Sequence, residues 1–217
     1  MVKYIFTLFV FAITGLFFNQ AYSQVAITGP TCVIQGTTYQ YSISGNLDSS
    51  STMHVCINGG IIADTSIKGS CSEDGPPLSA VQVVWSNGKK GSLTISSSKG
   101  NASISVNVTS SLTPGFIDSA SAKQDLYDTL GVPETIDCSK GTGGSCSPSY
   151  SYQWQRSRDA MTWEDIAGAT GKDLSFSQPA KHTFYYRRMI TEDNSNTIGY
   201  SNMAVVNVIV PQLNSGQ

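Results

Sequence analysis

Two stretches decide the fold of this chain: YSYQWQRSRDAMTWEDI at residues 150–166 and KHTFYYRRMITEDNSNTIGYSN at residues 181–202. Both alternate large and polar side chains, and a short polar turn interrupts the first one. Alternation with a period of two indicates a strand with one buried face. Tyr152 and Trp154 therefore share one face of the first strand, while Gln153 and Gln155 share the other. This pattern predicts an antiparallel β-sandwich.

The same residues carry a family resemblance. The pattern YSYQWQ.S.D..TW.DI.GAT of residues 150–170, followed by T.YYRR at 183–188 and YSN at 200–202, resembles the immunoglobulin-like repeats of large exported surface proteins of Bacteroidota. The first half, with TGP at 28–30 and VQVVW at 81–85, resembles the PKD-like domains that accompany those repeats. The resemblance implies an all-β protein of two tandem antiparallel β-sandwich domains, PKD-like and then immunoglobulin-like. It implies less about activity, because such sandwiches host many unrelated functions.

The N-terminus is typical of a secretory signal peptide. Lys3 precedes an apolar run at residues 5–18, and the small residues Ala21 and Ser23 place cleavage before Gln24. The run is shorter than the roughly 20 residues that span a bilayer. We therefore expect residues 1–23 to be removed. The mature chain is expected to have no transmembrane segment and to be exported to the extracellular space, the cell surface or the periplasm.

The remaining length suits two small domains. We expect a PKD-like sandwich at residues 24–110 and an immunoglobulin-like sandwich at 112–211. Because SVNVTSSLTPG in the first domain and VVNVIVPQLNSG in the second end alike, residues 212–217 are expected to be a mobile tail or the start of a missing further repeat. The junction SSLTPG is short and polar, which predicts that the two domains unfold independently.

Short strands are expected between turn signals such as Asn87-Gly88. We place them at residues 25–27, 38–43, 52–57, 80–85, 92–96 and 102–109 in the first domain, and at 150–156, 162–166, 174–176, 183–191 and 201–210 in the second. The only helix-like passage, 120–127, is short enough to be a strand instead.

The five cysteines all follow the signal peptide, where disulfides can persist, and their odd number leaves at least one over. Cys138 and Cys146 bracket the glycine-rich loop SKGTGGS, so we predict that they bond, with a chain-entropy contribution of about 2 to 3 kcal/mol. Cys56 with Cys71 is a second candidate. The sequence does not choose among Cys32, Cys56 and Cys71.

The charge pattern and the titratable residues argue against catalysis. The net charge is only −2, which is too weak and too scattered to argue for a nucleic-acid partner, and none is expected. The two histidines fall in different domains and there is no G-x-S-x-G, while the adjacent Glu164 and Asp165 point to opposite faces of one strand. His54 and Cys56 share a strand face, but no zinc-binding spacing accompanies them. We expect a buried histidine, no metal, no cofactor and no enzyme activity, with calcium at SEDG or TEDN a minor alternative.

Three sets of residues in the second domain are singled out. The structural core is expected at Tyr152, Trp154 and Trp163. Ser157, Asp159 and Thr162 come close to the Asp-box S-x-D-x-G-x-T-W, whose serine and aspartate fix a turn by bonding backbone N–H groups. The candidate ligand-facing residues are Tyr185, Tyr186, Arg187 and Arg188, since alternation forces some of these rings outward. The simpler account of both arginines is stacking on Trp154 or Trp163.

These inferences predict a non-catalytic exported adhesion, interaction or spacer module of a bacterial cell-surface or secreted protein. Its partner would be a protein or a glycan at the cell surface. The alternative is a carbohydrate-binding module that uses the exposed aromatic residues of the second domain.

Overall fold

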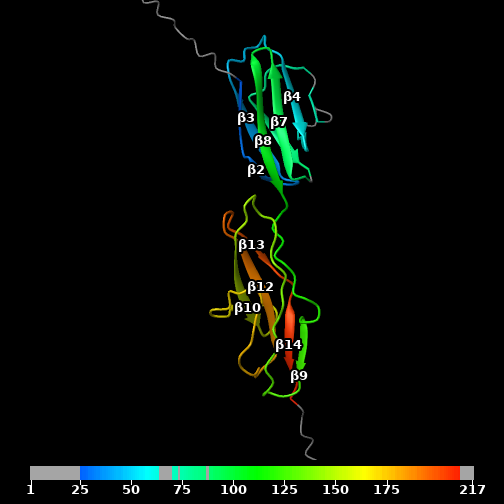
Figure 1. The fold of residues 1–217 in the computed structure, drawn as a ribbon, viewed down its shortest axis with the longest axis vertical. Coiled ribbons are helices and arrows are strands. Elements are labelled where there is room, and N and C mark those ends of the chain that lie inside the picture. Colours follow the sequence, from blue (N-terminus) through cyan, green and yellow to red (C-terminus); the bar gives the residue numbers. More distant parts are fainter. Residues whose placement is uncertain (1–24, 64–69, 73, 87, 211–217) are drawn as a thin grey trace, which may run out of the picture.

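The computed structural model describes residues 25–63, 70–72, 74–86 and 88–210. Every regular element within these ranges is a strand, and the strands form two sandwiches stacked end to end (Figure 1). Across the same residues no helix has the length and apolar character needed to cross a membrane. The predicted signal peptide, residues 1–23, and the predicted tail, residues 212–217, lie outside the described residues.

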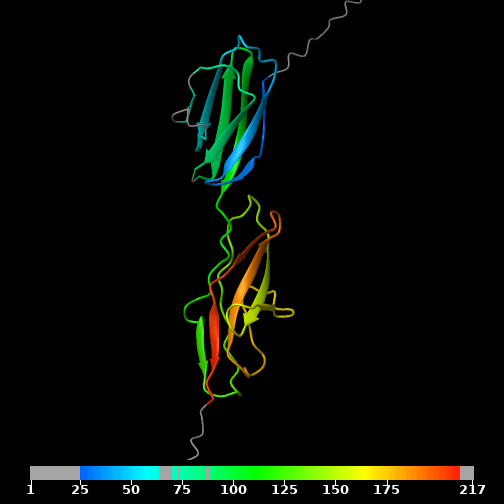
Figure 2. The same ribbon diagram turned by 180° about the vertical axis from the view of Figure 1, so that it is seen from behind.

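The first domain consists of two four-stranded sheets. One sheet has the order β1 (Ala26–Thr28), β3 (Thr38–Ser44), β6 (Ala80–Trp85) and β5 (Gly60–Ile62). The other has the order β2 (Cys32–Ile34), β8 (Gly100–Thr109), β7 (Lys90–Ser97) and β4 (Met53–Asn58). All pairs are antiparallel except β2 with β8. The two sheets face each other across a single apolar core (Figure 2).

Trp85 and Tyr41 form the centre of that core, and neither is exposed. Their rings meet edge to face with centroids 6.0 Å apart. The Trp85 Nε1–H group donates to the Tyr41 hydroxyl at 3.1 Å, and that hydroxyl donates to the Pro30 carbonyl at 3.0 Å. This chain satisfies both buried polar groups, so the large rings can fill the core without loss of hydrogen bonding.

The second domain is built on one sheet. Its path is β11 (Glu164–Asp165), β10 (Tyr150–Ser157), β12 (Phe184–Glu192), β14 (Ala204–Val208) and β9 (Lys123–Leu126), with β13 (Thr197–Tyr200) also paired to β12. The opposite layer has no long ladder: it is held by isolated bridges that join Thr113 to Thr142, Ile117 to Cys138 and Ile136 to Leu174. The core between the layers contains Trp154, Ile117 and Ile136, all fully buried.

The strand predictions hold best where side chains alternate. Residues 80–85 form β6 as expected, and the helix-like passage 120–127 contains the strand β9, which pairs parallel with β14. The predicted strand 162–166 shrinks to Glu164–Asp165, and 174–176 to a single bridge at Leu174. The short strands β2, β5 and β13 were not predicted, because three or four residues give too little alternation to recognise.

One predicted disulfide is wrong and the other is confirmed. Cys146 bonds to Cys32 of the first domain, across 114 residues of sequence and with Cα atoms 5.8 Å apart. Cys138 is a buried free thiol whose pKa is raised by burial. The Cys56–Cys71 bond, one of the pairings that the sequence left open, is present.

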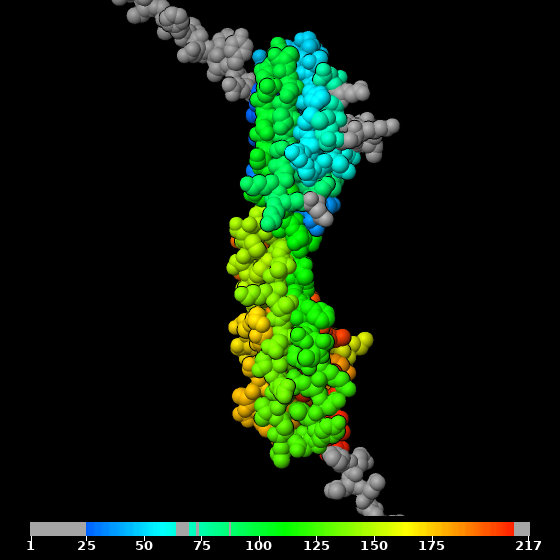
Figure 3. All heavy atoms as spheres, turned by 45° about the vertical axis from the view of Figure 1, so that its right-hand side comes forward, coloured from blue at the N-terminus to red at the C-terminus, as the bar shows by residue number. Residues whose placement is uncertain are grey.

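The glycine-rich loop explains the error. Instead of closing on itself, it runs beside the interdomain linker, where Thr113 and Thr142 exchange two backbone hydrogen bonds and Gly144 N–H donates to the Ser110 carbonyl at 2.9 Å. Its far end therefore reaches the first domain, and the two domains lie directly against each other there (Figure 3). Independent unfolding of the two domains was predicted because the junction is short and polar. The Cys32–Cys146 disulfide joins the domains covalently, so the junction is not their only connection.

Candidate functional site

Strand β12 carries all four residues that were predicted to face a ligand, but it has two different faces. Tyr186 and Arg188 point into the core, where they are 6% and 0% exposed. Tyr185 and Arg187 lie on the outer face and are half-buried. The prediction is therefore wrong for Arg188, because a strand between two layers presents only alternate side chains to solvent. Tyr186 is almost fully buried, but it lines a pocket beside the first residues of β12.

Arg188 is a structural residue. Its guanidinium donates to three backbone carbonyls, those of Ser139 at 2.6 Å, Lys172 at 2.7 Å and Pro114 at 2.8 Å. It also stacks on the Tyr152 ring, 4.2 Å from the centroid. These carbonyls belong to irregular segments of the second layer, so one buried cation replaces the missing backbone ladder that would otherwise hold them.

The predicted core residues are only partly correct. Trp154 is fully buried and donates from Nε1 to the Gly171 carbonyl at 3.1 Å, as expected for a core tryptophan. Tyr152 is half-buried against Arg188. Trp163 is also half-buried, on the outer face, where Arg187 lies between its ring and that of Tyr200 at 4.2 and 4.1 Å. The Arg187 guanidinium thus occupies the space between the two aromatic rings of the outer face.

The turn motif is confirmed as structural. The Asp159 carboxylate accepts hydrogen bonds from the Met161 and Thr162 N–H groups at 2.8 and 2.7 Å and from the Ser157 hydroxyl at 2.8 Å. These bonds, those from the backbone first, hold the pKa of Asp159 well below its usual range. The turn sets the direction in which the chain enters β11 and places Arg158 beside the start of β12.

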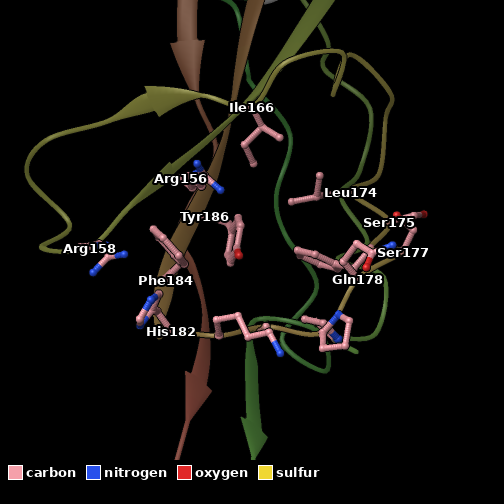
Figure 4. A pocket seen from close by; sticks show the side chains of 15 residues that line it. Arg156, Arg158, Ile166, Leu174, Ser175, Ser177, Gln178, His182, Phe184 and Tyr186 are labelled. Atoms are coloured by element: carbon pink, nitrogen blue, oxygen red, sulfur yellow. The ribbon is translucent and has the colours of Figure 1, made fainter. Parts of the chain in front are cut away.

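A pocket of about 480 Å³ lies beside the first residues of β12 (Figure 4). Its floor is apolar, with Phe184 and Tyr186 from β12 and Ile166, Leu174 and Phe176 from the segment that follows β11. Phe176 and Tyr186 meet edge to face with centroids 5.3 Å apart. A pocket of this size and composition accommodates one or two large side chains or a small ligand.

The rim of the pocket is basic. Arg156, Arg158, Lys181 and His182 line it, and no lining residue is acidic. Arg156 pairs with Glu164 at 2.6 Å, but among the described residues Arg158 has no carboxylate partner and lies 5.2 Å from the Phe184 centroid. The unpaired guanidinium over an apolar floor is suited to an anionic group attached to an apolar one.

Sequence reasoning missed this pocket and one buried acid. Arg156 and Arg158 flank Ser157, the first residue of the turn motif, and their i, i+2 spacing beside an aromatic strand was the available signal. Glu192, which belongs to the TEDN stretch considered for calcium, is fully buried. Hydrogen bonds from Ser195, and from Ser145 at 2.9 Å, lower the pKa of Glu192 to about 2. No sequence signal identifies it, because its partners are serines up to 47 residues away.

The sheets and this pocket define the class: a tandem β-sandwich protein with a small concave site on its second domain. Residues 75–210 match the model of DUF8696, a domain of unknown function, and because the match covers more than half of the chain the protein belongs to that family. No curated protein matches the chain.

The chain is also similar to several solved structures at low sequence identity. A C-terminal 282-residue fragment of intimin, in complex with the intimin-binding domain of its translocated receptor, is 14% identical with a TM-score of 0.44. This alignment covers 87% of the present chain and 66% of the fragment. The three N-terminal domains of the bacteriophage RB49 highly immunogenic outer capsid protein are 11% identical (TM-score 0.47, covering 87% and 70%). Mouse cadherin-23 EC22–24 is 12% identical (TM-score 0.40, covering 89% and 68%).

Proposed function

We propose that the protein is a non-catalytic exported adhesion, interaction or spacer module of a bacterial cell-surface or secreted protein, with domains at residues 24–110 and 112–211. The observation that carries this proposal is the basic pocket with an apolar floor on the second domain. The two disulfides support export, because such bonds persist in oxidising compartments. The similarity of the sequence to surface proteins of Bacteroidota supports a bacterial cell-surface setting.

The pocket fits a protein partner that inserts an acidic side chain next to an aromatic or aliphatic one. Charge complementarity favours this occupant: the rim carries Arg158 and Lys181, while the chain as a whole is weakly acidic at −2. Local positive charge on an acidic protein steers an acidic segment toward one place on its surface. The apolar floor then supplies the buried contact area on which affinity depends.

The position of the pocket suits presentation to a partner. Phe184 at the pocket begins β12, whereas Glu192 at the other end of that strand lies beside Ser145 and Ser149, next to the interdomain disulfide. Nine strand residues separate these ends by about 25 to 30 Å. The pocket therefore lies toward the end of the second domain that is distant from the first domain and the interdomain disulfide, which suits presentation of a binding site.

A glycan partner is the alternative. Sugars bind proteins by stacking on open aromatic faces. Guanidinium groups already cover three rings of this domain: Arg187 lies on Trp163 and Tyr200, and Arg156 lies 5.0 Å from the Phe184 centroid. Phe116 and Tyr127 are exposed, but they do not line the pocket. This arrangement supports a protein partner over a glycan.

The proposal is tested by fluorescence anisotropy of the full chain with labelled peptides that combine aspartate or glutamate with phenylalanine or leucine, alongside a glycan array. We expect binding to the peptides and at least a tenfold loss in Arg158→Glu. The matched control Arg187→Glu reverses a charge on the opposite face of the same sheet and should bind as wild type. Binding to glycans alone would select the carbohydrate-binding alternative, and binding to neither would leave the spacer role.

A further inference from the structure

A second chemical cluster lies in the first domain, apart from the proposed binding function. His54 and Cys56 belong to β4 and point to the same side of it, since they are two residues apart. Cys71 lies opposite Cys56 in an isolated antiparallel bridge, with Cα atoms 4.1 Å apart. Backbone hydrogen bonds from Ile57 N–H to Ser70 and from Ser72 N–H to Val55 flank that bridge at 2.6 and 2.8 Å. The backbone thus keeps both cysteines in place whether or not their sulfurs are bonded.

The imidazole of His54 completes the cluster. Its Nε2 lies 3.1 Å from the Cys56 sulfur, and its Nδ1 lies 3.3 Å from a carboxylate oxygen of Asp74. Nε2 and the two sulfurs all lie within 4.8 Å of one another. Histidines that bind metals through one nitrogen usually donate a hydrogen bond from the other to a carboxylate, which fixes the tautomer and the ring orientation. Asp74 stands in that position.

We propose that reduction of the Cys56–Cys71 disulfide converts this cluster into a binding site for Zn²⁺ or a similar thiophilic divalent cation. The ligands are the Cys56 and Cys71 thiolates and His54 Nε2, with the fourth position open to solvent. Zinc lies about 2.3 Å from sulfur and about 2.0 Å from nitrogen in a tetrahedral site, so its ligand atoms are about 3.5 to 3.8 Å apart. Side-chain rotations that separate the two sulfurs reach this spacing from the arrangement observed.

Electrons and protons are conserved in the reduction and in the metal binding that follows it. An external dithiol supplies two electrons and two protons, the S–S bond of Cys56 and Cys71 breaks to give two thiols, and the dithiol becomes a disulfide. The cation then displaces both thiol protons to solvent and forms two metal–sulfur bonds. His54 contributes the lone pair of Nε2 and keeps its proton on Nδ1, which donates to Asp74. Two thiolates neutralise the charge of the cation.

Access to the cluster favours this change. Cys71 is exposed, and the His54 side chain is 40% exposed rather than buried as its sequence position suggested. A reductant can therefore reach the Cys71 sulfur from solvent. The other disulfide, Cys32–Cys146, has no histidine close enough to form such a cluster among the described residues. It serves as an internal control.

The test is anaerobic titration of the full chain with Co²⁺, followed by competition with Zn²⁺, after reduction with a phosphine that leaves no competing dithiol. We expect one Co²⁺ per reduced chain with a thiolate-to-cobalt absorption band, and no band before reduction. Cys56→Ser/Cys71→Ser should abolish the band, and His54→Ala and Asp74→Asn should weaken binding about 10- to 100-fold. Cys32→Ser/Cys146→Ser should bind as wild type.

Circular dichroism of each sample reports whether the sheets remain folded. A folded, reduced wild-type chain without the band would overturn the site, as would a band that survives in Cys56→Ser/Cys71→Ser or disappears in Cys32→Ser/Cys146→Ser. A reduced chain that is unfolded and gains no structure with Co²⁺ would overturn it as well.

Discussion

Adjacent residues of β12 with the same side chain have opposite roles. Arg188 is fully buried and bonds three carbonyls, while Arg187 lies on the outer face between two rings and donates to Gln155 at 2.8 Å. The dipeptide alone does not reveal which arginine is buried. The pairing of β10 with β12 does reveal it, because the buried Trp154 lies opposite Arg188 and Gln155 lies opposite Arg187.

Arg188→Met should lower the free energy of unfolding of the second domain by about 3 kcal/mol or more. The methionine fills part of the space but leaves the carbonyls of Pro114, Ser139 and Lys172 without their donors, and each unsatisfied buried carbonyl costs about 1 to 3 kcal/mol. Denaturant unfolding followed by tryptophan fluorescence measures the change. Arg187→Met is the control and should cost less, about 1 to 2 kcal/mol, because the half-buried Arg187 loses two cation–π contacts but leaves no buried carbonyl unsatisfied. Equal losses in the two variants would contradict the structural role of Arg188.

Glu192 should make the stability of the second domain depend on acid pH. Its pKa is lowered to about 2 in the folded state, below the ordinary value of 4.5. A lowered acid pKa contributes stability that is present above the unfolded pKa and lost as pH falls through the folded one. The stability difference between wild type and Glu192→Gln should therefore shrink between about pH 5 and pH 2. Denaturant midpoints of both proteins across this range measure it, and a constant difference would be inconsistent with the hydrogen-bonded carboxylate.

At the scale of elements, the sequence predicted the regular sheets well and the second layer of the second domain poorly. Strands such as β6 and β10 alternate over six or more residues, so their faces can be read directly. The opposite layer is held by isolated β-bridges and by hydrogen bonds from side chains to backbone groups. It also contains glycines with positive φ, such as Gly115 and Gly143. These features depend on partners distant in sequence, and for that reason neither the carbonyl partners of Arg188, nor the burial of Glu192, nor the apolar floor of the pocket could be predicted from local pattern.

The turn between β10 and β11 contains one residue, Ala160, in a strained backbone conformation that a substitution can relieve. Ala160 adopts φ 59°, a left-handed conformation that costs a residue with a side chain about 1 kcal/mol relative to glycine. Ala160→Gly should therefore be neutral or stabilising by up to about 1 kcal/mol. Ala167→Gly, in a turn without positive φ, should destabilise by about 0.5 to 1 kcal/mol through chain entropy alone. Thermal unfolding of the two variants compares them, and a loss at both positions would rule out strain at Ala160.

At the scale of the whole molecule, a covalent bond and a few backbone hydrogen bonds join two separate cores. The core around Trp85 and the core around Trp154 share no buried residue. The linker residues Ser110 and Thr113 instead pair with the loop that leads to Cys146. Spacing rules favoured a bond between near neighbours, Cys138 and Cys146, because sequence separation says nothing about a loop that folds back along a linker.

The Cys32–Cys146 bond should therefore set the orientation of the two domains without being needed to fold either one. In Cys32→Ser/Cys146→Ser we expect both cores to remain intact, while the domains hinge about residues 110–113 and sample a broader range of shapes. Small-angle X-ray scattering of the oxidised proteins should show a wider distribution of dimensions for this variant than for wild type.

Cys56→Ser/Cys71→Ser is the matched control, because it removes a disulfide that lies within the first domain and should leave the scattering curve unchanged. The closed loop of 114 residues also implies that the interdomain bond stabilises the folded chain by about 4 to 5 kcal/mol in denaturant unfolding. Scattering identical to wild type would instead mean that the paired backbone of Thr113 with Thr142, and of Ser110 with Gly144, is sufficient to hold the junction rigid.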